Sequence, residues 1–161
     1  MSGAVVVLSG GQDSTTCLFW AKAQGFHPLH AITFDYGQRH GREIACAGVV
    51  AKRAQVASHQ IIGIPDLLTS TSPLVDQEIA LETYESFEHM ERVIGDRIEL
   101  TFVPMRNALF LTIAANRALA LRCTDVVTGV CEEDNANYPD CRESFVLAQE
   151  RATREALGVP G

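Results

Sequence analysis

The chain has 161 residues, of which 47 % are hydrophobic and 20 % are charged, and its formal net charge is −7. This length suits a single domain, residues 1–161, with a core large enough to fold without disulfides. The acidic balance argues against a nucleic-acid partner, because such a partner requires basic side chains that neutralise its phosphates. No apolar run approaches the roughly 18 residues that a membrane span requires.

The acidic charge is concentrated between residues 71 and 99. Eight acidic side chains lie there with Arg92 and Arg97, a local charge of −6, which leaves −1 of the total of −7 for the rest of the chain. This segment is predicted to be a surface insertion that contains a short helix.

Cysteine and histidine patterns indicate the compartment and the absence of a metal cluster. The five cysteines are odd in number and form no C-x-x-C pair, and the five histidines show no ligand-like spacing. The first residues, MSGAVVVLSGG, carry no basic region typical of a signal peptide. These features predict a reducing cytoplasm and no metal ligands within this chain.

The first half of the chain alternates strand and helix patterns. Residues 4–8 are a short apolar run typical of a central strand, and residues 14–24 form a helical pattern that ends at a glycine. Residues 30–34 predict a second strand, and residues 39–57 have apolar positions spaced three or four apart, as in a helix. Residues 59–64 predict a third strand.

The alternation resumes after the acidic segment. Residues 107–122 predict a helix that is apolar on nearly all sides and is therefore expected to be buried. Residues 125–130 predict a fourth strand, residues 131–141 a polar loop, and residues 143–157 a last helix. The whole pattern predicts the α/β class, a parallel sheet with helices on both faces. Ligands of such sheets bind beyond the carboxyl ends of the strands.

Ser-Gly-Gly-Gln-Asp-Ser, residues 9–14, separates the first strand from the first helix. Glycines let backbone N–H groups approach a ligand closely, and the start of a helix adds unpaired donors and a partial positive charge. The segment therefore predicts an anion site, to which the hydroxyl groups of Ser9, Ser14 and Thr15 can donate. Asp13 is interpreted as either the N-cap of the helix or a partner of Mg²⁺. The competing interpretation is a plain Gly-Gly turn capped by Asp or Ser.

SGGQDS resembles the PP-loop of the N-type ATP pyrophosphatases, a superfamily with an adenine-nucleotide alpha-hydrolase-like fold. Three further stretches resemble the 7-cyano-7-deazaguanine synthase family: FDYGQRH (34–40), TFVPMRNALFLTIAA (101–115) and TGVCEEDNANYPDCRESF (128–145). The resemblance implies an ATP-dependent ligase of queuosine precursor biosynthesis. Such an enzyme converts 7-carboxy-7-deazaguanine and ammonia to the nitrile through adenylated intermediates, with ATP and Mg²⁺.

The resemblance also implies residue roles. The residues expected to bind ATP are Leu8, Ser9, Gly10, Gly11, Gln12, Asp13, Ser14, Thr15, Thr16, Cys17 and Leu18. Asp13, Ser14 and Arg106 are expected to be catalytic. The residues expected to bind the substrate are Tyr36, Arg39, His40, Asn107, Asp140 and Arg142.

Several of these roles have structural alternatives. Arg39 and His40 would equally suit a solvated helix start. Asp140 and Arg142 would read the guanine-like edge and the carboxylate of the substrate, or would stabilise their loop by contacting each other. The ring of Tyr36 would stack on a purine-like ring or pack at the rim of the core.

The chain departs from the family at its C-terminal end, at Met105, and at Asn135-Ala136-Asn137, which differs from the residues usual there. Family members continue beyond the last residue of this chain with a cysteine-rich tail that holds Zn²⁺ and with a last strand, so this chain is expected to be truncated at the C-terminus relative to them. Zn²⁺ is therefore expected from the family, but its ligands are not in this chain. Met105 stands where the family usually has glycine, a change expected only to reshape a turn.

Two other functions compete with this interpretation. A GMP or NAD synthetase-like enzyme would share the first loop, although FDYGQRH and YPDCR disfavour it. A nucleotide-binding fragment without catalysis would lack the zinc tail. The family also leads us to expect a homodimer.

Overall fold

The computed structural model describes residues 2–37, 42–64, 67–68, 72–74, 82–95, 97–98, 100–131 and 137–159. Within these ranges no helix has both the length and the apolar character that crossing a bilayer would require.

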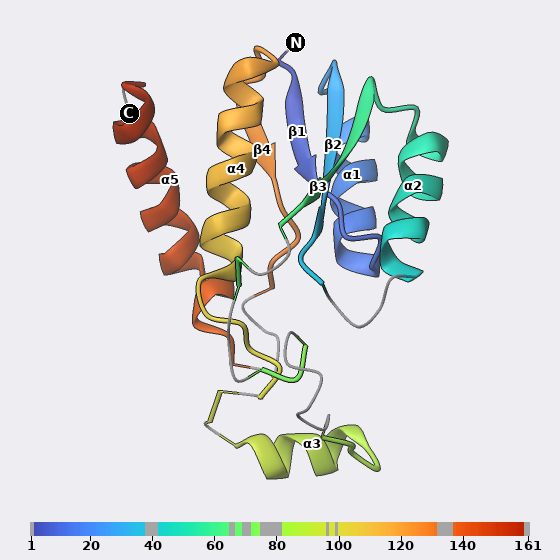
Figure 1. Cartoon of the computed structure of the whole chain (residues 1–161), viewed down its shortest axis with the longest axis vertical. Helices are drawn as coiled ribbons and strands as arrows, with labels where there is room; N and C mark the ends of the chain where they lie inside the picture. The colour runs from blue at the N-terminus through green and yellow to red at the C-terminus, as the bar shows by residue number, and fades with distance from the viewer. Residues whose placement is uncertain are drawn as a thin grey trace.

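Four parallel strands form one sheet in the order β3-β2-β1-β4 (Figure 1). The strands are β1 (Ala4–Val7), β2 (Leu29–Asp35), β3 (Ser58–Gly63) and β4 (Asp125–Val127). All four predicted strands are confirmed, but β4 is shorter than the predicted 125–130. Residues 128–130 leave the sheet and approach the first turn of the first helix, where a Cβ on Gly129 would lie 3.0 Å from the backbone nitrogen of Ser14.

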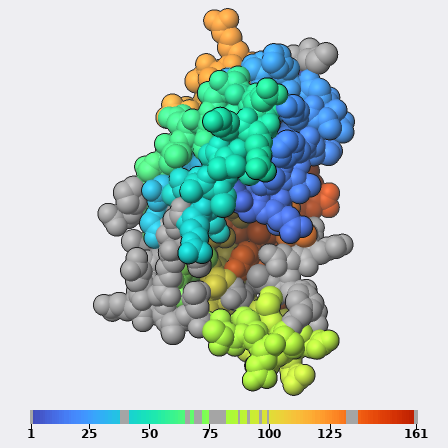
Figure 2. All heavy atoms as spheres, turned by 90° about the vertical axis from the view of Figure 1, so that its right-hand side faces the viewer, coloured from blue at the N-terminus to red at the C-terminus, as the bar shows by residue number. Residues whose placement is uncertain are grey.

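Helices cover both faces of the sheet, as predicted. The first helices, α1 (Gln12–Ala23) and α2 (Arg42–Ala54), pack on one face, and α4 (Arg106–Ala120) packs on the other. The last helix, α5 (Glu143–Leu157), runs beside α4 and is preceded by a 3-10 turn, η1 (Pro139–Cys141) (Figure 1). Figure 2 shows α2 and α1 as the outer layer of the first face. The predicted burial of the helix at 107–122 holds for the side that faces the sheet and is wrong on the other, where Leu119 is 57 % exposed.

The core is split between the two faces because successive strand side chains point in opposite directions. Ala4 and Val6 of β1 pack with Leu18 of α1 and Ala47 of α2. Val5, one residue away, belongs to a second cluster with two α4 side chains, Ala114 and Ala118. Alanines at these helix positions let α2 and α4 approach the sheet closely.

A short helix, α3 (Phe87–Ile94), lies within the acidic segment, as the sequence predicted. Figure 1 shows α3 beyond the carboxyl ends of the strands, well away from the sheet. Arg97 and Glu82 form an ion pair of 2.7 Å beside it, and Nδ2 of Asn137 donates to the carbonyl oxygens of Gly95 and Arg97. The segment is thereby joined to the chain just before η1.

The strand order places a switch point between β1 and β4. From β1 the chain moves through β2 to β3 on one side, whereas β4 pairs with the other side of β1. Loops that leave two such strands diverge and open a crevice, which is where parallel sheets bind ligands. The segment that follows β1 is SGGQDS.

Candidate functional site

The loop after β1 presents main-chain donors. Gly11 is the N-cap of α1 and has no side-chain cap bond, so the first N–H groups of the helix, those of Gln12, Asp13 and Ser14, are not satisfied by a capping side chain. The first intrahelical bond of the turn runs from the N–H of Thr15 to Gly11 O, at 3.1 Å. Three adjacent donors at a helix N-terminus favour an anion.

Gly10 is the tightest point of this loop. Its φ is +91°, and a Cβ there would lie 2.4 Å from the carbonyl oxygen of Glu43 and 2.7 Å from the backbone nitrogen of Ala47. No other residue type fits both the dihedral angle and the space. The loop is therefore packed directly against the first turn of α2.

Two serines hold the loop in shape. Ser14 Oγ donates to Gly11 O at 3.1 Å, accepts from the N–H of Ser9 at 3.2 Å and lies 3.0 Å from Ser9 Oγ. Ser9 Oγ in turn accepts from the N–H of Gly11 at 3.2 Å. Ser14 is buried, and Ser9 is exposed, so Ser14 shapes the loop from within while the Ser9 side chain is open to solvent.

The alternative role of Asp13 as an N-cap is wrong, because Gly11 occupies that position and Asp13 lies one step inside the helix. The negative charge of Asp13 instead affects the pKa of Cys17, one turn further along α1. Burial, and secondarily this charge, raises the pKa of the Cys17 thiol, which donates to Thr128 O at 3.7 Å. Cys17 is therefore a neutral thiol that links α1 to the end of β4.

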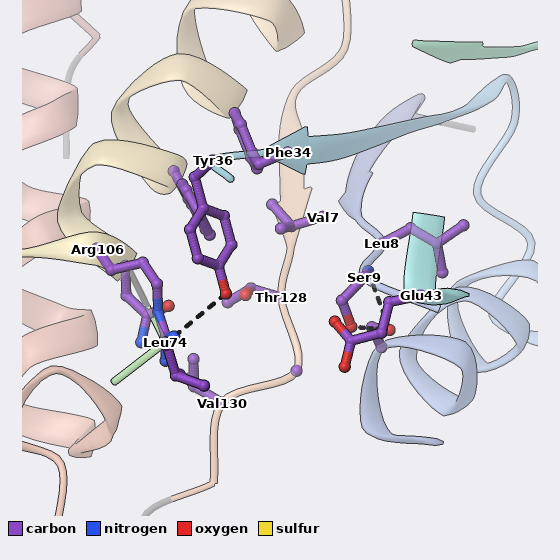
Figure 3. A pocket seen from close by; sticks show the side chains of 14 residues that line it. Val7, Leu8, Ser9, Phe34, Tyr36, Glu43, Leu74, Arg106, Thr128 and Val130 are labelled. Atoms are coloured by element: carbon purple, nitrogen blue, oxygen red, sulfur yellow. Dashed lines mark hydrogen bonds between the residues drawn. The ribbon is translucent and has the colours of Figure 1, made fainter. Parts of the chain in front are cut away.

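A cavity of about 300 Å³ opens beside the loop at the carboxyl edge of the sheet (Figure 3). Its charged lining residues, among those the structure describes, are Glu43 and Arg106. The full lining is Val7, Leu8, Ser9, Ser14, Phe34, Tyr36, Glu43, Leu74, Arg106, Asn107, Phe110, Thr128, Gly129 and Val130.

Arg106 and Tyr36 form one side of this cavity. Arg106 Nη1 donates to the hydroxyl of Tyr36 at 3.5 Å, and its guanidinium carbon lies 5.9 Å from the centre of the tyrosine ring. Tyr36 also contacts Phe110, with ring centres 5.6 Å apart. In Figure 3 this group lies across the cavity from Ser9 and Glu43. The structure thus brings together two predicted residues that are 70 positions apart in the sequence.

Asn107 and Asp140 join the start of α4 to η1. The backbone N–H of Asn107 donates to Asp140 Oδ2, and its side-chain Nδ2 donates to Asp140 O, both at 3.1 Å. Asp140 is 6 % exposed and caps α4 from another part of the chain. The alternative, in which Asp140 and Arg142 contact each other, is wrong. Arg142 belongs to neither of the two ion pairs found among the described residues, and it is the exposed N-cap of α5.

The remaining predicted residues have different surroundings. Leu18 is fully buried in the core and does not line the cavity, and Thr16 Oγ1 donates to Gln12 O within α1. Arg39 and His40 lie outside the described residues. Met105 adopts φ +64°, the left-handed conformation that glycine adopts without strain, so the turn before α4 has the backbone shape of a glycine position although methionine occupies it.

Sequence reasoning missed several residues at this edge. Glu43, Thr128 and Gly129 line the cavity but were given no ligand role from the sequence. Thr33, within the apolar run of β2, is 1 % exposed and donates to Leu8 O at 2.6 Å, just before the loop. A threonine inside a buried parallel strand was the available signal, because a buried hydroxyl requires a partner.

No three His, Cys, Asp or Glu side chains of the described ranges come together in a way that could hold a metal ion. The described residues therefore do not fit the Zn²⁺ that the family resemblance implied, and no chemical step below depends on it.

Comparison with known proteins identifies the family. Residues 3–159 match the profile of the family described as "Queuosine biosynthesis protein QueC". The chain belongs to the QueC family. A curated relative from Gloeobacter violaceus (strain ATCC 29082 / PCC 7421), named 7-cyano-7-deazaguanine synthase, is 46 % identical over 157 residues, which are 98 % of this chain and 64 % of that protein. The chain thus spans just under two thirds of the length of that relative.

A solved structure shares the fold. It is the predicted subunit of a tRNA methyltransferase from Methanocaldococcus jannaschii, with a TM-score of 0.52 and 20 % identity over 96 % of this chain and 65 % of that one. At this identity the likeness supports the α/β architecture and says nothing of activity.

Proposed function

We propose that this QueC-family chain is the ATP-binding part of an ATP-dependent carbon–nitrogen ligase that converts 7-carboxy-7-deazaguanine and ammonia to 7-cyano-7-deazaguanine. The observation that carries the proposal is the loop at Gly10 and Gly11, which turns unpaired N–H groups of α1 toward the carboxyl edge of the sheet. The name of the 46 % identical relative supports the substrate assignment.

The reaction needs activation because a carboxylate is a poor electrophile. A carboxylate oxygen attacks the α-phosphorus of ATP, the bond to the β-phosphate oxygen breaks, and pyrophosphate leaves. Ammonia then attacks the acyl adenylate, loses a proton and expels AMP to give the amide. The amide oxygen then attacks the α-phosphorus of a second ATP and a second pyrophosphate leaves; loss of AMP and of both amide protons from this adenylated amide gives the nitrile. Each oxygen of the acid thereby leaves in one AMP.

The chain contributes mainly by positioning and neutralising charge. The N–H groups of Gln12, Asp13 and Ser14 are proposed to hold the departing pyrophosphate, and Ser14 Oγ keeps the loop in the shape that presents them. Arg106, opposite the loop, is proposed to stabilise negative charge that develops on the transferred phosphoryl group.

The substrate is proposed to lie in the cavity against the side that Arg106 and Tyr36 form together. Asn107 borders the same cavity, and Asp140 fixes Asn107 through two hydrogen bonds. Arg39, His40 and Arg142 complete the proposed set of substrate-binding residues. Arg142 is solvent-exposed in this structure.

The wider assignments belong to the same proposal. We propose a single ATP-binding domain with an acidic surface insertion at 71–99, acting as a homodimer in the cytoplasm on small molecules. The net charge of −7 supports the absence of a nucleic-acid partner. Light scattering during size-exclusion chromatography measures the oligomeric state.

Mass spectrometry after incubation with 7-carboxy-7-deazaguanine, ammonium, ATP and Mg²⁺ tests the reaction. Formation of the nitrile with AMP and pyrophosphate is the expected result. Ser14→Ala is expected to abolish turnover, because the Ser14 hydroxyl holds the loop that presents the N–H groups. Asp13→Ala keeps the backbone N–H and tests whether the Asp13 side chain also takes part, as the sequence predicted. Turnover of xanthosine monophosphate in place of the deazaguanine acid would instead indicate a GMP synthetase, and unchanged activity of Ser14→Ala would contradict the role of the loop.

A further inference from the structure

Glu43 is an acidic side chain placed where an anion is proposed to bind. It lies in the first turn of α2, its carbonyl oxygen faces Gly10, and its side chain lines the same cavity as Ser9 and Ser14. Figure 3 shows its carboxylate beside Ser9. Among the described residues, neither of the two ion pairs includes Glu43.

Among the described residues that line the cavity, no cation lies at the Glu43 end. A triphosphate on the loop would bring several negative charges next to the Glu43 carboxylate. Arg106, the cation among the described lining residues, lies on the opposite side of the cavity (Figure 3). Like charges at short range oppose binding, so a carboxylate here disfavours the nucleotide unless a cation lies between them.

We propose that Glu43 is a Mg²⁺ ligand, and that the ion is shared between its carboxylate and the phosphate oxygens of the bound nucleotide. This inference rests on the proposed binding of ATP. Mg²⁺ prefers oxygen ligands and is commonly held by one or two carboxylates together with substrate phosphates. A site of that kind needs no preformed cluster of three protein ligands.

Glu43 suits this role better than Asp13, the partner of Mg²⁺ suggested by the sequence. Asp13 is not among the described residues that line the cavity, and its charge acts on Cys17 on the β4 side of α1. Glu43 reaches the loop from α2 and lines the cavity beside Ser9.

Calorimetric titration with an ATP analogue that carries a methylene group between the α- and β-phosphorus atoms tests the proposal without catalysis. Dissociation constants are measured in Mg²⁺ and in EDTA for the wild type, Glu43→Gln and Glu43→Asp. The matched control is Glu88→Gln, which removes one charge from an exposed position of α3. Thermal unfolding of each variant checks that the fold is retained.

The expected signature is a change of opposite sign in the two conditions. Glu43→Gln should weaken analogue binding in Mg²⁺ by about tenfold or more, and should tighten binding in EDTA because a repulsive charge is gone. Glu43→Asp should retain part of the Mg²⁺ dependence, and Glu88→Gln should match the wild type. Equal Mg²⁺ dependence in Glu43→Gln and the wild type would overturn this proposal alone. Failure of the wild type to bind the analogue in either condition would overturn the proposed function as well.

Discussion

Gly10 shows how a single residue type fixes the geometry of the loop. Its φ is positive, and a Cβ added there would lie only 2.4 Å from Glu43 O, so the loop has no room for a side chain. Any substitution must displace either the loop or the first turn of α2. Because the loop amides and Glu43 both belong to the candidate site, such a displacement affects both.

A matched pair of glycine substitutions tests this point. Gly10→Ala should abolish nucleotide binding and lower stability, whereas Gly48→Ala, in α2 with no atom within 4 Å of its added Cβ, should leave binding unchanged. Gly48→Ala should also raise the free energy of unfolding by about 0.5–1 kcal/mol, since alanine favours a helix over glycine. Urea unfolding and calorimetry measure both effects, and normal nucleotide binding by Gly10→Ala would show that the loop does not require glycine there.

The sequence predicted the residues that follow the strands better than those that approach from neighbouring helices. SGGQDS, Tyr36 and Arg106 could be assigned because each follows a strand or carries a charge beside an apolar helix. Glu43 could not, because its contact with Gly10 depends on how α2 packs. Cys17 could not be recognised as a link to Thr128 for the same reason.

At the scale of elements, α4 depends on a cap that comes from another element. Met105 precedes α4 without a side-chain cap bond, and Asp140 of η1 supplies the acceptor for the N–H of Asn107. Its carboxylate also lies at the positive end of the helix dipole. The start of α4 carries Arg106 and Asn107, so this contact positions two proposed site residues.

Substitution of Asp140 tests the contact. Asp140→Ala should lower the free energy of unfolding by about 1 kcal/mol, the usual cost of a lost helix cap. Asp140→Asn keeps an oxygen acceptor and should lose less stability, although it alters the charge. Chemical denaturation measures both, and equal stability of Asp140→Ala and the wild type would show that the cap contributes nothing.

The pairing of β2 with β3 gives a pH dependence. Burial lowers the pKa of His59 below its ordinary value of 6.5, and His59 Nε2 lies 2.8 Å from Thr33 Oγ1. The unfolded chain then binds more protons than the native one, so this contribution to stability is complete above pH 6.5 and is lost as the pH falls below it. His59→Gln can keep the hydrogen bond without titrating.

Thermal unfolding over a pH series checks this prediction. As the pH falls below 6.5, the midpoint temperature of unfolding of the wild type should decrease relative to that of His59→Gln. A difference that is constant with pH would show that the native state does not disfavour protonation of His59.

Element boundaries were predictable where local signals set them and not where tertiary contacts do. Residues 143–157 form α5 as predicted, with Gly158 at its C-cap in the left-handed conformation. The first helix starts at Gln12 rather than at residue 14, because Gly11 caps it. β4 stops at Val127 because the next residues pack on α1.

At the scale of the molecule, the order of strands determines which loops can meet. Alternation of strand and helix predicted a parallel sheet, but nothing in the sequence showed that β4 would pair with β1. That pairing places Thr128 and Gly129 against the loop after β1 and makes the cavity possible. Helix α3 lies beyond the same carboxyl edge of the sheet (Figure 1).

Transfer of ¹⁸O from the substrate carboxylate to AMP is the sharpest test of the proposed chemistry, because it follows the atom that attacks phosphorus. With both carboxylate oxygens labelled, we expect each AMP formed to carry one ¹⁸O and the nitrile to carry none. Unlabelled AMP, or ADP and labelled phosphate in its place, would contradict the proposal that the loop at Gly10 and Gly11 holds pyrophosphate as the leaving group.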